Sequence, residues 1–232
     1  MRTELKGRTA VVTGAAGTMG RAVVAALAAD GLHVVGLDVK PAKGCIECDI
    51  SDSQAVAKAV RAIGRVDVLV NNAGILSNNK AEATTPEEWR RVLAANLDGA
   101  FYLSRQVIPG MKKRRWGRIV NTCSLAAKTG GLTAGTAYAT SKGALTSLTF
   151  SLARELAPFG VTVNGISPAY VRTPMVTKQL NAAQRRSVLA QIPVGRFCEP
   201  EEFAHVVRFL VHPLAGFITG EIVDLNGGVI MD

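Results

Sequence analysis

The chain has 232 residues, 48% of them apolar and 19% charged. A chain of this length buries roughly 70–75% of the surface that its unfolded form exposes, so we expect one domain spanning residues 1–232 that folds without disulfides or a structural metal. The composition excludes a disordered, collagen-like or cysteine-rich protein. Charged residues interrupt the apolar runs, and Glu4 and the early glycines break any signal-peptide pattern. We therefore expect a soluble cytoplasmic protein without a membrane span.

The net charge is +9, and part of this excess forms one basic cluster around Trp116. Its members are Lys112, Lys113, Arg114, Arg115 and Arg118. The cluster fits a solvated helix end, where cations suit the negative pole of the helix dipole, or a landing surface for coenzyme A phosphates or an acidic carrier protein. No aromatic RNA-binding signature or helix-turn-helix accompanies it, so nucleic acid is not expected as a partner.

The four cysteines include a C-x-x-C pair, Cys45 and Cys48. No second pair and no nearby histidine complete a zinc site, so we expect no metal.

Short apolar runs alternate with helical segments along the chain. Strands are expected at 9–13, 33–37, 45–48, 66–70, 118–122, 161–166 and 221–225. Helices are expected at 20–29, 53–63, 86–111, 137–157 and 200–211. Short buried strands that alternate with helices predict a doubly wound, Rossmann-type α/β domain, with a seven-stranded parallel sheet and helices on both faces.

The segment between Thr173 and Pro200 breaks this alternation, because it contains a helical stretch at 181–191 but no strand. Such an excursion lies over the carboxyl edge of the sheet, where open α/β folds bind ligands. We therefore expect a substrate lid at about 174–199.

A glycine-rich turn joins the first strand to the first helix. The residues expected to meet a pyrophosphate there are Gly14, Gly17, Thr18, Met19 and Gly20. Glycines let backbone amides approach the phosphates, and the helix N-terminus adds positive potential. Asp38 ends the second strand, where a carboxylate accepts hydrogen bonds from both ribose hydroxyls and repels a 2′-phosphate. The turn and Asp38 favour NAD over NADP, although Lys40 and Lys43 weaken the discrimination.

Tyr138 and Lys142 stand four residues apart on a predicted helix, so both side chains leave the same face. An ammonium beside a phenol favours the phenolate, which makes proton exchange useful near neutral pH. Ser124 follows the strand at 118–122, where its hydroxyl can orient a carbonyl. An isolated Tyr-x-x-x-Lys is common in helices, so its significance depends on the surrounding motifs.

In combination, these motifs resemble the short-chain dehydrogenase/reductase family over essentially the whole chain. The matching markers are Thr13 to Gly20, Asp49, Asn71 to Gly74, Asn96, Ser124, Tyr138 with Lys142, Asn164, and Pro168 to Thr173. The resemblance implies that Tyr138 is the general acid/base and that Ser124 polarises the substrate oxygen. It also implies that Lys142 lowers the tyrosine pKa and holds the nicotinamide ribose, and that Asn96 anchors a proton-relay water.

The same resemblance implies the remaining cofactor contacts. Asp49 and Ile50 would meet the adenine, and Asn72, Ala73 and Gly74 would pass close to the cofactor backbone. Pro168, Val171 and Thr173 would line the nicotinamide end, with Val171 and Thr173 at the carboxamide. Asn71 is expected to be structural.

Three features depart from the family pattern. Thr18 stands where the family has glycine, and Ala169 follows Pro168 where the family has Pro-Gly. The spacing from Ser124 to Tyr138 is one residue longer than in bacterial ketoacyl reductases, which places an insertion within 128–136 beside the substrate.

Within the family, the lid and tail are most similar to 3-oxoacyl-acyl-carrier-protein reductases, which usually prefer NADPH. The leading expectation is therefore hydride exchange with a secondary alcohol or ketone, in particular a 3-oxoacyl or 3-hydroxyacyl thioester of coenzyme A or a carrier protein. One alternative is an NAD-dependent dehydrogenase of a small polyol, cyclic diol or diketone, and another is a catalytically silent regulatory protein. The resemblance also implies a homotetramer that pairs the helices at 86–111 and 137–157.

Overall fold

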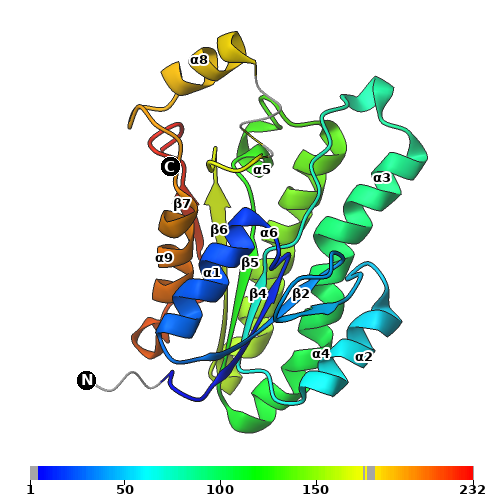
Figure 1. The fold of residues 1–232 in the computed structure, drawn as a ribbon, viewed down its shortest axis with the longest axis vertical. Helices are drawn as coiled ribbons and strands as arrows, with labels where there is room; N and C mark the ends of the chain where they lie inside the picture. The colour runs from blue at the N-terminus through cyan, green and yellow to red at the C-terminus, as the bar shows by residue number, and fades with distance from the viewer. Residues whose placement is uncertain (1–4, 175, 177–180, 232) are drawn as a thin grey trace.

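The computed structural model describes residues 5–174, 176 and 181–231, and a single seven-stranded sheet forms its centre (Figure 1). The strand order is β3-β2-β1-β4-β5-β6-β7, and all neighbours are parallel. The strands are β1 Thr9–Thr13, β2 His33–Asp38, β3 Cys45–Glu47, β4 Val68–Asn71, β5 Gly117–Thr122, β6 Val161–Pro168 and β7 Ile222–Leu225. The prediction of a doubly wound α/β sheet is confirmed.

Helices cover both faces of the sheet (Figure 1). One face carries α1 Thr18–Ala29 and α9 Pro200–Val211, and the other carries α2 Ser53–Ile63, α4 Gly99–Arg114 and α6 Thr136–Leu156. Val11 packs into the core below α2 and α4, whereas its neighbour Val12 packs below α1 and α9. Burial on both faces explains why the strands read as continuous apolar runs. Within the described ranges, no helix has the length and apolar character that a membrane crossing requires.

The helix predicted over 86–111 is divided into three parts. α3 Pro86–Leu93 continues into a π-helical turn, η2 Ala94–Asp98, and then into α4, which ends at Arg114. A π turn inserts one residue into the helical repeat and so re-aims its side chains. The apolar pattern of the sequence did not predict this turn, nor the short helix α5 Ala126–Thr129. The remaining short helices are η1 Ala81–Ala83, η3 Ala157–Phe159 and η4 Pro213–Ala215.

The segment expected as a lid contains the helix α8 Ala182–Ala190, near the predicted 181–191. Asn181 and Gln184 begin α8 with a reciprocal capping box. α8 lies beyond the carboxyl ends of the strands, at the top of Figure 1. Residues 175 and 177–180 of the expected lid lie outside the described part of the chain.

Gly20 has no room for a side chain, because a Cβ there would lie 2.1 Å from the Gly14 carbonyl oxygen and 2.8 Å from Ala15 Cα. We expect Gly20→Ala to destabilise the fold by on the order of 3 kcal/mol, since the turn between β1 and α1 must open. Gly143→Ala in α6 is the matched control, because a Cβ there would meet no described atom beyond its own helix within 4 Å. It should be neutral or stabilising by up to about 1 kcal/mol. Urea unfolding measures both, and equal stabilities would contradict the prediction for Gly20.

Candidate active site

The glycine-rich turn ends in an uncapped helix N-terminus. Gly14 adopts a φ of +64°, and Gly17 precedes α1 without a side-chain cap. The amides of Thr18, Met19 and Gly20 belong to the first helical turn and so have no partner within the helix. Three such amides and the helix dipole suit the phosphates of a dinucleotide. Thr18, which stands where the family has glycine, is the first residue of α1. The threonine therefore lies in the helix and leaves the preceding turn intact.

Thr13 braces this turn from below, a role that the sequence reasoning missed. Its buried hydroxyl accepts hydrogen bonds from the backbone amides of Asn72, at 3.0 Å, and Ala73, at 2.9 Å. The Asn72 side chain in turn donates to the Thr13 carbonyl oxygen at 2.9 Å. Asn72 therefore uses its side chain to join the end of β4 to the glycine turn. A buried threonine at the end of the first strand was the available signal.

Asp38, the last residue of β2, lies beside the glycine turn. One carboxylate oxygen accepts from the Ala16 amide at 3.0 Å, and the other accepts from the Lys40 amide at 2.9 Å. Each oxygen keeps a further lone pair for a ligand hydroxyl. The Asp38 carboxylate next to the glycine turn can therefore accept hydrogen bonds from the hydroxyl groups of a bound ligand.

Asp49 and Ile50 behave differently from each other. Asp49 is exposed and accepts hydrogen bonds from the Ser51 amide at 2.9 Å and the Ser51 hydroxyl at 2.7 Å. Ile50 is buried and packs against Gly99, where a Cβ would lie 2.6 Å from Ile50 Cδ1. The Ile50 side chain thus belongs to the core, and only Asp49 presents its side chain at the surface.

Tyr138 and Lys142 lie one turn apart on α6. Lys142 is 3% exposed and donates to the Thr122 carbonyl oxygen at 2.7 Å, and its Nζ lies 5.8 Å from the centre of the Tyr138 ring. Burial lowers the pKa of Lys142 to about 8. Burial raises the pKa of Tyr138, and the hydrogen bond with Ser124 acts against that increase. At neutral pH this leaves a protonated phenol beside an ammonium and a serine hydroxyl.

Asn96, on the π turn, connects α6 to the segment after β4. Its Nδ2 donates to the Ile75 carbonyl oxygen and the Ser141 hydroxyl, both at 3.0 Å, and its Oδ1 accepts from the Ile75 amide at 2.8 Å. Ser141 donates onward to the Tyr138 carbonyl oxygen at 2.7 Å. The Asn96 side chain is therefore engaged by the protein itself. A relay water held by Asn96 stays a prediction.

Gly74 lies close to this group. A Cβ on Gly74 would be 3.1 Å from Asn96 Oδ1 and 3.4 Å from Lys142 Nζ. Because Gly74 has no side chain, its backbone approaches Asn96 and Lys142 closely.

The segment after β6 completes this edge of the sheet. The Pro168 carbonyl oxygen accepts from the Leu125 amide at 3.1 Å, which holds the ends of β5 and β6 together. Val171 is buried and pairs with Cys198, and the Thr173 amide donates to the Val171 carbonyl oxygen at 2.7 Å. Among the described residues, Arg115 is the only non-glycine with a positive φ. Ala169 therefore replaces the family's glycine without backbone strain.

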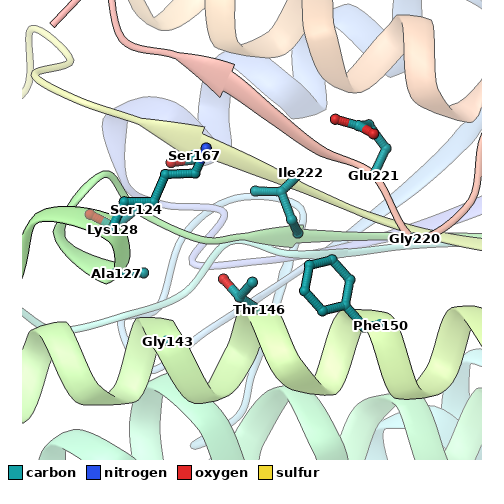
Figure 2. A pocket seen from close by; sticks show the side chains of 10 residues that line it. All are labelled: Ser124, Ala127, Lys128, Gly143, Thr146, Phe150, Ser167, Gly220, Glu221 and Ile222. Carbon is teal, nitrogen blue, oxygen red and sulfur yellow. The ribbon is translucent and has the colours of Figure 1, made fainter. Parts of the chain in front are cut away.

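Two cavities meet at Ser124. The smaller, of about 120 Å³, also contains Tyr138. The larger, of about 400 Å³, lies between α6 and β7 and does not include Tyr138 in its lining; Figure 2 shows Thr146 and Phe150 of α6 below Ile222 of β7 there. Of these two cavities, the smaller is the one from which Tyr138 can be reached.

The basic cluster around Trp116 lies at the opposite edge of the sheet, because α4 leads directly into the start of β5 whereas Ser124 follows its end. Lys112 pairs with Glu155 at 3.0 Å, and Arg114 pairs with Asp67 at 3.3 Å. The cluster therefore fits the helix-end interpretation, and a carrier docked there would be remote from Tyr138.

A glycine turn, an acidic residue at the end of β2, and a serine, tyrosine and lysine at the carboxyl edge define a dinucleotide-binding α/β enzyme. Comparisons identify the family. Residues 14–230 match a family model described as Enoyl-(Acyl carrier protein) reductase. The chain belongs to the short-chain dehydrogenase/reductase family of oxidoreductases, whose members bind nicotinamide dinucleotides.

Three relatives illustrate the similarity. The 3-oxoacyl-[acyl-carrier-protein] reductase of Vibrio cholerae is 39% identical, over 98% of this chain and 99% of that protein. The structure of a 3-oxoacyl-[acyl-carrier protein] reductase from Brucella melitensis gives a TM-score of 0.92 at 34% identity, covering 98% and 93% of the two chains. A Beutenbergia cavernae protein assigned as an NAD(P)-dependent gluconate 5-dehydrogenase, solved with NADP, gives 0.90 at 37% identity, covering 97% of each chain.

Proposed function

We propose that the protein reduces 3-oxoacyl thioesters to 3-hydroxyacyl thioesters with a nicotinamide dinucleotide. The observation that carries the proposal is that Ser124 and Tyr138 line one cavity at the edge that bears the glycine turn, with the Lys142 ammonium 5.8 Å from the centre of the Tyr138 ring. Full-length similarity to 3-oxoacyl reductases supports the thioester as the substrate class. The grouping is intact by residue type, which argues against a catalytically silent regulatory protein.

The proposed mechanism assigns one task to each side chain. Ser124 donates a hydrogen bond to the substrate carbonyl and so polarises it. Tyr138, protonated at neutral pH, gives its proton to the same oxygen as negative charge develops. Lys142 stabilises the resulting phenolate while its ammonium remains charged below a pKa of about 8. The dinucleotide supplies the hydride when bound, and the residues present fit its phosphates and ribose.

We expect Tyr138→Phe to lower kcat for the reduction of acetoacetyl-coenzyme A by at least about a thousandfold, because the proton donor is lost. NADH binding, followed by fluorescence titration, should stay within about threefold of wild type. The rate at which NADH absorbance falls gives kcat. Unchanged turnover in this variant would refute the acid/base role, and a wild-type enzyme inactive on the thioester would refute the substrate.

A second candidate is the oxidation of a small polyol or hydroxy acid. The similarity to the Beutenbergia cavernae protein favours it, as does a cavity of only about 120 Å³ that carries several hydroxyl groups. A panel of thioesters, polyols, hydroxy acids, cyclic diols and diketones, run with NAD and NADP in both directions, separates the two functions.

We propose that NAD(H) is preferred over NADP(H), because the Asp38 carboxylate would repel a 2′-phosphate. We expect Asp38→Ser to raise the ratio of kcat/KM for NADPH to that for NADH at least tenfold. Glu47→Ser is the matched control, since Glu47 is an exposed carboxylate on β3 that pairs in register with Asp38 on β2. In this variant the NADPH-to-NADH ratio of kcat/KM should change less than twofold. A wild-type enzyme that strongly favours NADPH would contradict the proposal.

We propose that the protein assembles as a homotetramer. Phe101 on α4 is 43% exposed and Phe150 on α6 is 50% exposed, and burial of such side chains between subunits is favourable. We expect light scattering to give four times the 24.4 kDa chain mass. A monomeric mass would exclude the assembly. The cytoplasmic location stays a prediction.

A further inference from the structure

A second phenol, that of Tyr170, lines the same cavity as Tyr138 and Ser124. The Tyr170 ring packs against the buried Phe197, with ring centres 6.3 Å apart and planes tilted by 45°. The Tyr170 carbonyl oxygen accepts from the Cys198 amide at 3.0 Å. Ring and backbone are both fixed, so the phenol is presented to the cavity in a defined place.

The Tyr170 hydroxyl meets the hydroxyl of Thr133, 3.4 Å away, on the loop between α5 and α6. A hydrogen bond of this length is weak, and each hydroxyl has one donor and two acceptor positions. Both groups therefore keep capacity for a ligand. The other walls of the cavity are mainly apolar, with contributions from Leu76, Leu125, Leu132, Ala134 and Val176.

The loop that carries Thr133 is anchored on both sides. Lys80 Nζ donates to the carbonyl oxygens of Gly131, at 2.9 Å, and Ala134, at 2.7 Å. The Gly135 amide donates to the Ser77 carbonyl oxygen at 2.7 Å. Thr133 lies between these attachment points, so its distance from Tyr170 is set by the fold. This is also the loop in which the sequence indicated an insertion.

We propose that Tyr170 and Thr133 form a second oxygen site, which binds an oxygen atom of the substrate a few bonds from the reacting carbon. The inference rests on the proposed function, because a 3-oxoacyl thioester carries its second carbonyl two carbons from the ketone. A ketone without that oxygen displaces water from the two hydroxyls and replaces none of its hydrogen bonds, so the pair discriminates against it. The pair thus selects doubly oxygenated substrates.

Ethyl acetoacetate and 2-heptanone test this site, because their chains have equal numbers of atoms and only the first has oxygen beyond the ketone. The quantity measured is the ratio of kcat/KM for ethyl acetoacetate to that for 2-heptanone at saturating dinucleotide. We expect wild type to favour ethyl acetoacetate, and Tyr170→Phe to lower the ratio at least tenfold. Thr133→Val should lower it at least threefold, and Thr133→Ser, which retains a hydroxyl, should restore it.

Tyr102→Phe is the matched control, since Tyr102, on α4, packs against the hydrophobic core between the sheet and α2, α4 and α6 and does not line this cavity. Its ratio should stay within twofold of wild type. NADH affinity and the thermal midpoint verify that each variant is folded.

An unchanged ratio in folded Tyr170→Phe would overturn the inference, as would a wild-type enzyme that reduces both ketones equally well. Acetoacetyl-coenzyme A separates this outcome from failure of the proposed function. The wild-type enzyme could fail to reduce acetoacetyl-coenzyme A and still favour ethyl acetoacetate, with a ratio that falls in Tyr170→Phe. That result would refute the thioester substrate and support the second oxygen site.

Discussion

The burial of the Lys142 ammonium at the carboxyl end of β5 is the constraint around which this site is built. Removing a cation from water is costly, and the Thr122 carbonyl oxygen offsets only part of that cost. The remaining cost is visible as a pKa lowered to about 8, which still keeps the charge at neutral pH. The Thr122 carbonyl oxygen at the end of β5 contacts this ammonium, and Gly74 comes near it, since a Cβ on Gly74 would lie 3.4 Å from Nζ.

A series of buried polar contacts keeps the strand ends in register around this cation. Asn71 on β4 donates to Asn121 on β5 at 2.8 Å, and Asn121 donates to Thr149 on α6 at 2.9 Å. Thr13 and Asn96 extend the series to β1 and to the segment after β4. Buried hydrogen bonds of this kind stiffen a core, because breaking one bond leaves its partner buried and unpaired, as Asn71 Oδ1 already is. Binding groups from several elements therefore share one frame.

The sequence was informative where the chemistry is local. Full burial on two faces makes the strands apolar, and the Tyr138 and Lys142 spacing follows directly from helical geometry. The sequence was uninformative where the hydrogen-bond partners are distant along the chain. The hydroxyl of Thr13 accepts from amides about 60 positions away, and Lys80 donates to carbonyl oxygens more than 50 positions away. The π turn at Asn96 likewise depends on backbone groups of Ile75 and leaves no apolar signature.

Lys80 holds the loop before α6 through the carbonyl oxygens of Gly131 and Ala134, and the side chains of Leu132 and Thr133 between them take no part in this attachment. Both contacts of the ammonium are to main-chain oxygens, which every amino acid provides. Leu132 is 55% exposed and contributes little to the packed interior, and Thr133 is exposed as well. Substitutions of Leu132 and Thr133 should therefore change the stability of the fold little. Such substitutions can alter which substrate is preferred while Ser124, Tyr138 and Lys142 stay the same.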